Sequence, residues 1–536
     1  MSDQLATGNK KKLNVFLIYP PTTVFWPNET IPAAQSQLGL GYLASYLREY
    51  LDPSIDLTLG ILDCAIEGLG VRLDDEERQC SRYGLSEEDI LARLEAFKPD
   101  IVGITSMWTA YATDAHDVAR LIKDNMPDTK VIVGGTHASI QPRMTILDDN
   151  IDVVAIGEGE VTFLELVTKM ARGEDYSEVL GTALKLPNGE IKENARRPLI
   201  EDLDTIPFPA RDLMNMKKYF EVLKSPYLMR TPMTSVFSSR GCPYKCNFCS
   251  IHSVWERKWR KRSPKNVADE LEHLIKDYGV REVSFLDDNL SVNRKRLHGI
   301  CDEIIERKLD FKWSTPNGTA YWTLDKDVLK KMKQAGCYRL TFGVESGCPE
   351  TRSYMQKNVS LKKAETMCKE ANRLGMWTIS TYIIGFPYET KEQILQSLEF
   401  AITSGTDWAS FYLLMPFIGT GVYEDFKKEG LLNFDAYLNP SEHDENVLIA
   451  LSAILSQGGT ATTLFTAEEL KALQTRMTKK FVLNRVLNPT APLRVLSKVR
   501  SFEDLQYLRR IVVSFLHIMK DLLRNRYSLV SSIHTE

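Results

Sequence analysis

The chain has 536 residues, of which 43% are hydrophobic and 26% are charged, and its formal net charge is −4 at pH 7. This length exceeds what one hydrophobic core usually organises, so we expect two or three domains of an ordinary water-soluble composition. The small net charge argues against nucleic acid as a partner. The sequence has neither an apolar run of about 18 residues nor a signal-peptide pattern at its start, which predicts a cytoplasmic protein.

Residues 13–170 alternate strand patterns with helix patterns. The strand patterns are LNVFLIYPP, LTLGILDC, DIVGITSMW, KVIVGGTHAS and DVVAIGEGE. Five parallel strands with helices on both faces are expected, and right-handed crossovers make this part a doubly wound α/β sheet. Its ligand-binding edge is then the one formed by the carboxyl ends of the strands, where YPP, TSMW, GGTHAS and GEGE fall.

The rest of the chain divides into a linker, a second α/β domain and a helical region. Patterns weaken over residues 171–233, which we expect to be a linker with a hairpin at LKLPNGEIKE. Six strand-helix units in residues 234–430 predict an open, partial (β/α)6 barrel with its site at the carboxyl ends of the strands. Residues 431–536 have helical patterns, and residues 1–12 are predicted to be disordered.

Three cysteines follow the first barrel strand in the segment SSRGCPYKCNFCSIHS. Cys242, Cys246 and Cys249 are separated by three residues and then by two. A closed tetrahedral metal site needs four ligands, whereas three thiolates hold three irons of a cubane and leave the fourth iron open. The pattern therefore favours an iron-sulfur cluster at the barrel mouth. The alternative is a zinc site of three cysteines and one histidine, with His252 as its fourth ligand.

Other residues of the barrel have two interpretations from the sequence alone. Asp287 and Asp288 end the second barrel strand, where they either serve the site or cap the following helix. The remaining cysteines have no metal-type spacing and are predicted to be packing residues: Cys64, Cys80, Cys301, Cys337, Cys348 and Cys368.

The cysteine spacing, with Phe248 before the last cysteine, resembles the signature of the radical S-adenosylmethionine (SAM) superfamily. The loops FLDDNLSVN, FGVESG, YIIGFPYET and LLMPFIGTGVYE follow in the order seen in that family. With the N-terminal half included, the resemblance covers residues 13–431 and is to the branch that carries a cobalamin-binding domain ahead of the radical SAM domain.

The resemblance implies a 4Fe-4S cluster held by the three cysteines, with the amino and carboxylate groups of SAM on the open iron. An electron from a donor such as flavodoxin or ferredoxin would then cleave SAM to a 5'-deoxyadenosyl radical. By the same resemblance, Glu345 accepts hydrogen bonds from the ribose or amino group of SAM, and Gly385 and Pro387 let the backbone approach the adenine. The alternative interpretation of Glu345 is a solvated residue at the end of a strand, and that of Pro387 is part of an ordinary turn.

In the N-terminal half, the resemblance implies that Thr105, Ser106, Gly134 and Gly135 bind cobalamin. A departure from the better-known D-x-H-x-x-G pattern is that the loop after the first strand, YPPTTVFWPNETIP, contains no histidine. DCAIEG has alanine at the histidine position, and DAHDVA lies in a helix and lacks the glycine. We therefore expect cobalamin without a histidine below the cobalt, and we interpret His137 as a hydrogen-bonding loop residue. An empty domain is the alternative.

These inferences converge on a cobalamin-dependent radical SAM methyltransferase that acts on an unactivated carbon of a small-molecule or lipid-like metabolite through the deoxyadenosyl radical and methylcobalamin. The runner-up is a radical cyclisation or rearrangement without methyl transfer. A rival of another class is a non-catalytic iron-sulfur redox or sensor protein, which needs a cluster but no SAM pocket.

The C-terminal segment LQYLRRIVVSFLHIMKDLLRNRY is amphipathic and basic, with nine Lys or Arg against three Asp or Glu between residues 485 and 527. This pattern is typical of a helix that lies on anionic lipid, and it predicts a peripheral membrane contact. The preferred interpretation is a helix that packs its apolar stripe against the barrel, because surface helices are ordinarily amphipathic.

Overall fold

The computed structural model describes residues 11–26, 37–432, 437, 439–456, 459–489 and 491–523. These residues form two compact units. The first unit contains the described residues of Met1–Ile200, Thr205–Lys218 and Phe434–Ser456, and the second contains those of Glu201–Asp204, Tyr219–Asn433 and Gln457–Glu536. Of the segment predicted to be disordered, residues 1–10 lie outside the described residues, and the first strand already begins at Lys11.

The first unit is built on a seven-stranded sheet. Its strands are β1 (Lys11–Tyr19), β3 (Ile55–Asp63), β6 (Ile101–Thr105), β7 (Lys130–Gly134), β8 (Val153–Ala155), β9 (Thr182–Lys185) and β10 (Ile191–Glu193). They lie in the order β10-β9-β8-β7-β6-β1-β3, and the five strands from β8 to β3 are parallel, as predicted. The chain reverses its direction of winding between β1 and β6, so this doubly wound sheet has its ligand-binding crevice outside the carboxyl ends of these two strands.

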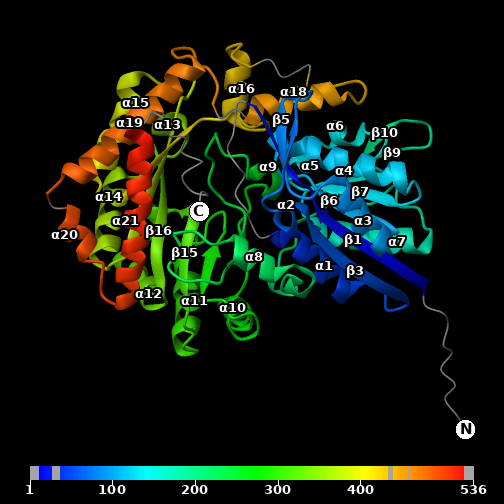
Figure 1. The fold of residues 1–536 in the computed structure, drawn as a ribbon, viewed down its shortest axis with the longest axis horizontal. Helices are drawn as coiled ribbons and strands as arrows, with labels where there is room; N and C mark the ends of the chain where they lie inside the picture. Colours follow the sequence, from blue (N-terminus) through cyan, green and yellow to red (C-terminus); the bar gives the residue numbers. More distant parts are fainter. Residues whose placement is uncertain are drawn as a thin grey trace, which may run out of the picture. The chain divides into compact units, whose positions relative to one another are not determined.

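Helices cover both faces of this sheet (Figure 1). Helices α1 (Leu38–Tyr50) and α7 (Gly159–Arg172) pack on one face, and α3 (Glu87–Phe97) and α4 (Ala112–Asn125) on the other. Alternate residues of β1 enter the two cores because successive side chains of a strand point to opposite faces. A strand that is buried on both faces has a continuous run of apolar residues, and for this reason these strands are recognisable in the sequence.

Three parts of the first unit differ from the expected organisation. The hairpin β9–β10 falls in the segment expected to be a linker, yet it pairs with β8 and widens the sheet. Helix α18 (Glu445–Ser456), expected in the C-terminal helical region, belongs to this unit and packs on α4 and on the short helix η1 (Thr109–Tyr111). An antiparallel three-stranded sheet of β2 (Thr22–Phe25), β5 (Cys80–Tyr83) and β4 (Arg72–Asp75) was not predicted at all.

Short helices complete the first unit. They are α2 (Cys64–Glu67), α5 (Thr136–Ile140), α6 (Pro142–Ile146), η3 (Arg211–Leu213) and α8 (Met216–Val222), whose last residues pass into the second unit.

The second unit is an open barrel of six parallel strands, which confirms the predicted partial (β/α)6 architecture. The strands lie in the order β11 (Met233–Val236), β14 (Glu282–Phe285), β15 (Lys312–Thr319), β16 (Cys337–Glu345), β17 (Trp377–Ile384) and β18 (Trp408–Leu413). The connecting helices are α10 (Pro264–Tyr278), α11 (Arg294–Glu306), α12 (Lys326–Gln334), α14 (Leu361–Arg373) and α15 (Lys391–Thr403). Their apolar faces and the strands form one continuous core.

Further elements surround the barrel strands. They are η2 (Leu203–Thr205), β12 (Ser239–Arg240), α9 (His252–Trp255), β13 (Arg260–Lys261), η4 (Tyr321–Thr323), α13 (Pro349–Tyr354), α16 (Gly421–Lys428), α19 (Ala467–Leu487), α20 (Ala491–Leu496) and α21 (Phe502–Leu523). Helix α19 packs on β18 and α15. Among the described residues, no helix is long and apolar enough to span a membrane.

Helix α21 packs against the barrel. Tyr507 is buried and contacts Tyr338 and Trp377 edge to face, and Ile511 packs beside them. This is the preferred of the two sequence interpretations, and Phe515 of the apolar stripe also packs against the barrel core, although other apolar side chains of the helix lie outside it. Leu505 and Leu516 remain exposed on α21.

Candidate active site and cofactor-binding residues

The loop that carries the three cysteines leaves the carboxyl end of β11 and is anchored by two buried aspartates. Asp287 accepts hydrogen bonds from the backbone N–H of Ser238 at 2.9 Å and from its hydroxyl at 2.6 Å. Asp288 accepts one from the backbone N–H of Gly241 at 2.7 Å, directly before the first cysteine. Burial raises the pKa of Asp288 to about 6. Both carboxyl groups therefore position the cysteine loop.

Neither aspartate caps the following helix. The N-cap of α11 is Asn293, whose side chain accepts a hydrogen bond from the backbone N–H of Arg296 at 2.9 Å. Gly241 is a second local requirement of the loop, because its φ is 82° and a Cβ there would lie 2.1 Å from the carbonyl oxygen of Lys258.

The three cysteines are half-buried, in contrast to the other six cysteines, which are all buried and free. Burial raises the pKa of each of the three thiols, that of Cys249 to about 12. Thiols in such surroundings ionise only when a cation binds them. Asn289 points its side-chain N–H at the sulfur of Cys242 from 3.9 Å, as a hydrogen-bond donor to a cluster ligand does.

Among the described residues, the three cysteines and His252 do not form a close group of potential zinc ligands. A tetrahedral site with Zn–S bonds of about 2.3 Å places its sulfurs about 3.8 Å apart. Within the described part of the chain, one group of three potential ligands has its ligand atoms all within 4.8 Å of one another, and it contains none of the three cysteines or His252. The zinc arrangement weighed from the sequence is therefore not formed.

Phe248 connects the cysteine loop to the loop after β17. Its ring meets that of Phe386 edge to face at 6.3 Å, and both pack in a cluster with Met355 and Val422. The residue before the last cysteine thus acts as an apolar anchor for the loop.

Glu345 ends β16 in a conformation that few non-glycine residues adopt. Its φ is 67°, and the pairing of β16 with β17 has a bulge between Gly343 and Glu345. The carboxylate accepts a hydrogen bond from Lys357 at 2.9 Å, and both side chains are almost buried. Glu345 also acts electrostatically on the Cys246 thiol. A strained, ion-paired and almost buried carboxylate is not a solvated strand-end residue.

The loop GFPYET after β17 is held by a residue that the sequence did not single out, Glu389. Its carboxyl group accepts hydrogen bonds from the backbone N–H of Gly385 at 2.9 Å and of Phe386 at 3.4 Å, and burial raises its pKa to about 7. Gly385 has a φ of 92°, and Pro387 is buried, with its carbonyl bonded to Thr463. Glu389 is visible in the sequence only as one more acidic loop residue.

In the first unit, Thr105 and Ser106 lie at the reversal point of the sheet, at the carboxyl end of β6. The backbone N–H of Ser106 donates to the carbonyl of Gly134 at 2.7 Å, while the Ser106 hydroxyl is buried and makes no hydrogen bond. A Cβ on Gly135 would lie 2.5 Å from the Ser106 carbonyl oxygen, so the close approach of the neighbouring loop by itself requires this glycine. Trp108 is half exposed next to this edge. An unsatisfied hydroxyl and an exposed aromatic side chain at a sheet crevice fit a large, partly polar ligand.

The histidines of the first unit are held by other groups. His137 is buried and hydrogen-bonds Thr109 through Nδ1 at 3.0 Å, and burial lowers its pKa to about 3. His116 bonds Asp148 through Nδ1 at 2.7 Å.

Comparisons with known proteins agree with both units. The family model described as "Radical SAM superfamily" matches residues 236–401, and the "B12 binding domain" model matches residues 30–167. An uncharacterized methyltransferase of Pyrococcus horikoshii is 34% identical over 77% of this chain and 83% of its own length. The chain therefore belongs to the radical SAM superfamily and carries an N-terminal B12-binding domain. It is a radical SAM enzyme whose cofactors are a 4Fe-4S cluster, SAM and cobalamin.

Other relatives are named for two kinds of reaction, methyl transfer and cyclisation. The cytidylyl-2-hydroxyethylphosphonate methyltransferase of Streptomyces wedmorensis is 30% identical over 81% of this chain and 85% of its own. The anaerobic magnesium-protoporphyrin IX monomethyl ester cyclase of Rubrivivax gelatinosus is 28% identical over 66% of this chain and 63% of its own. The fold matches that of TsrM, a radical SAM methyltransferase of Kitasatospora setae solved with cobalamin and a 4Fe-4S cluster, with a TM-score of 0.66 at 15% identity, covering 96% of this chain and all of TsrM.

Proposed function

We propose that the protein is a cobalamin-dependent radical SAM methyltransferase that methylates an unactivated carbon of a small-molecule or lipid-like metabolite. The observation that carries the proposal is the presence in one chain of an anchored three-cysteine loop and of a B12-binding sheet with an unsatisfied edge. Methyl transfer is supported further by two relatives of 30% identity or more, both of which are named as methyltransferases.

Different residues of the second unit have different roles at the proposed cluster and SAM site. Cys242, Cys246 and Cys249 bind three irons, and Glu345, pre-positioned by Lys357, accepts hydrogen bonds from the ribose or amino group of SAM. Gly385, next to Pro387 and held by Glu389, presents backbone to the adenine. The Phe248 contact keeps the cysteine loop in register with this loop.

In the first unit, Thr105, Ser106, Gly134 and Gly135 form the edge proposed to bind cobalamin, with the Ser106 hydroxyl as a hydrogen-bond donor. When bound, the cluster and SAM supply one-electron chemistry that opens a C–H bond, and cobalamin carries the methyl group. A one-electron donor such as reduced flavodoxin or ferredoxin completes the system.

The test follows the fate of SAM in cluster- and cobalamin-loaded protein under a reductant. A methyltransferase converts one SAM to S-adenosylhomocysteine when the bound cobalamin is methylated and cleaves another to 5'-deoxyadenosine. Formation of methylcobalamin and S-adenosylhomocysteine supports the proposal even before the substrate is known. 5'-Deoxyadenosine without either product favours cyclisation or rearrangement, and the absence of all three products favours the redox or sensor protein.

A peripheral membrane contact through α21 is the finer part of the proposal and bears on the substrate class. Leu505, Val512 and Leu516 are 49%, 45% and 61% exposed on α21, and Arg509 is exposed among them. Exposed apolar and basic side chains on one helix are typical of an interfacial contact with anionic lipid.

This contact is tested with a variant that leaves the buried side of α21 intact. We expect wild-type protein to co-sediment with vesicles rich in phosphatidylserine at low salt, and Val512→Gln/Leu516→Gln protein to remain in the supernatant. Tyr507, which docks the helix, is unchanged in that variant, so its fold is retained. Equal sedimentation of both proteins, or none of either, would remove the membrane contact and with it the support for a lipid-like substrate.

A further inference from the structure

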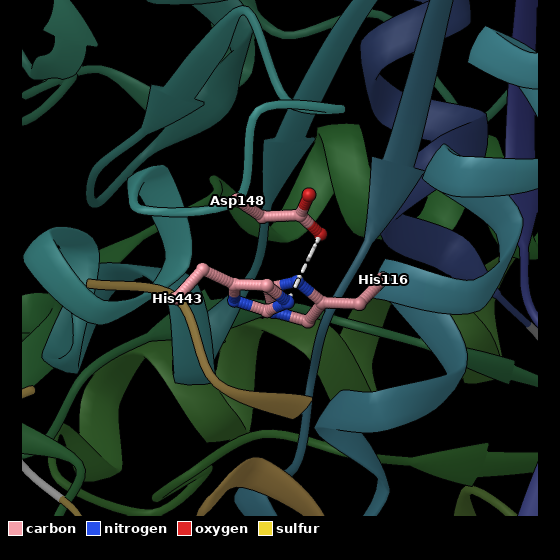
Figure 2. Close-up of side chains that lie close together, drawn as sticks. All are labelled: His116, Asp148 and His443. Carbon is pink, nitrogen blue, oxygen red and sulfur yellow. Dashed lines mark hydrogen bonds and ion pairs between the residues drawn. The ribbon is translucent and has the colours of Figure 1, made fainter. Parts of the chain in front are cut away.

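Two histidines and an aspartate from distant parts of the sequence meet in the first unit (Figure 2). His116 lies on α4, Asp148 follows α6, and His443 lies directly before α18. One ligand atom from each of the three lies within 4.8 Å of the others. The two histidines are 327 residues apart in the sequence, so no short motif indicates this group.

The hydrogen bonds of this group leave ligand atoms unused. His116 Nδ1 pairs with Asp148 Oδ2 at 2.7 Å. The His116 side chain is only 8% exposed, and its Nε2 is buried without a hydrogen-bond partner. The His443 ring stacks on that of His116 at 5.4 Å, and its Nε2 lies 3.9 Å from the same carboxylate oxygen. An ion that replaces the proton shared by His116 and Asp148 would lie between Nδ1 of His116 and Oδ2 of Asp148, with Nε2 of His443 beside it.

The surroundings favour a cation. His116, Asp148 and His443 line a cavity of about 460 Å³, whose wall also contains Glu442 and Asp444. Asp117 and Glu445 also line the cavity, but both carboxylates are paired with Arg78 and Arg120, so these four charges cancel.

We propose that His116, Asp148 and His443 bind a divalent metal ion of the kind that prefers imidazole ligands, with zinc as the best match. Two imidazole nitrogens and one carboxylate oxygen suit zinc, and a fourth ligand is available from Glu442, Asp444 or water. The ion is structural: it joins the segment before α18 to α4 and to the residue after α6, and so fixes α18 on the first unit.

Zinc content of the cluster-loaded full-length protein is the direct test, since the three cysteines are then occupied by iron. Protein is stripped with a mild chelator, given Zn²⁺, desalted and analysed for iron and zinc together. We expect about one zinc per chain beyond the cluster iron, and its loss in His443→Ala and Asp148→Asn proteins. The matched control is His273→Ala, which removes a histidine that also pairs with an aspartate, Asp277, but lies exposed on α10 without a third ligand.

Two further measurements keep the test decisive if a variant folds poorly. Zn²⁺ added to stripped wild-type protein should raise the midpoint of thermal unfolding, because a ligand that binds only the folded state stabilises it. Co²⁺ should give the visible absorption of a site with nitrogen and oxygen ligands, without thiolate charge-transfer bands. Wild-type protein that retains no zinc after desalting, or that loses zinc equally in the His273→Ala control, would overturn the proposal.

Discussion

The cysteine loop of the second unit and the carboxyl edge of the first unit, which are proposed to bind the cluster and cobalamin, are built in different ways. In the cysteine loop and in the loop after β17, carboxyl groups accept hydrogen bonds from backbone N–H groups. Asp288 accepts one from Gly241, and Glu389 accepts one from Gly385. At the edge of the first unit, the loops bond each other through backbone groups, and the Ser106 hydroxyl remains unsatisfied. One site is fixed in advance by side chains, and the other leaves hydrogen-bonding capacity for its ligand.

This difference follows from what each ligand needs. An open cluster requires a few thiolates at set positions, and small displacements of those ligands would break it. Cobalamin is a large ligand that contacts a whole sheet edge, so many individually weak contacts suffice. Substitutions should therefore have large effects in the cysteine loop and small effects at the sheet edge.

The largest effect is expected from Cys246→Ala. Because the remaining two thiolates cannot hold a cubane, the iron content of anaerobically reconstituted protein should fall from about four to near zero per chain. 5'-Deoxyadenosine should disappear with it, while cobalamin binding to the first unit is retained. Iron and cobalamin are measured on the same sample, and a variant that kept its cluster would show that another residue supplies the ligand.

The next effect concerns Glu345→Gln. The substitution keeps an acceptor oxygen but removes the charge, so SAM should bind on the order of tenfold more weakly, since charged hydrogen bonds exceed neutral ones by about 1 kcal/mol. Lys357→Met should act in the same direction, and the double variant should be non-additive because the two side chains form one pair. Equilibrium SAM binding checks this, and unchanged affinity would assign the pair to loop structure alone.

A third effect, on stability and not on activity, compares the buried carboxyl groups of the two units. Burial raises the pKa of Glu389 to about 7 from an ordinary value of 4.5, and that of Asp114, which bonds Thr23 of β2, to about 7 from 3.8. At a pH between the ordinary pKa of each group and its raised pKa, the folded protein holds a proton that the unfolded chain releases. The free energy of unfolding therefore falls as the pH rises from the ordinary to the raised pKa. For Glu389 the loss approaches about 3 kcal/mol by pH 8.

Glu389→Gln should lack this loss in the second unit, and Asp114→Asn should lack it in the first. Thermal unfolding from pH 5 to pH 8 measures the difference in slope from wild type, with Glu392→Gln as the control at an exposed carboxylate of α15. Parallel profiles for wild type and variant would mean that the buried carboxyl group is already ionised at pH 5.

The same contrast explains what the sequence could and could not predict. The parallel strands of both units and the three-cysteine loop after the first barrel strand were predictable, because buried parallel strands are continuous apolar runs and because the three cysteines are close in sequence. The roles of Asp288 and Glu389 were not, since a carboxyl group that accepts backbone hydrogen bonds has no pattern of its own. The placement of α18 in the first unit was missed because its contacts are with residues more than 300 positions away, such as that of Ser452 with Thr109.

The smallest effect is expected at the sheet edge, from His137→Ala. His137 is the histidine nearest to the proposed cobalamin-binding residues in sequence, but its Nδ1 bonds Thr109 and its ring is buried. His116 is held by Asp148, and the loop after β1 contains no histidine. The electron paramagnetic resonance spectrum of bound cob(II)alamin should therefore lack nitrogen superhyperfine splitting, and His137→Ala should leave the spectrum unchanged. Splitting that vanished in this variant would identify His137 as the axial ligand and would mean that α5 rearranges when cobalamin binds. His116→Ala is the parallel control, and it too should leave the spectrum unchanged, because the metal proposed at His116 is not the cobalt.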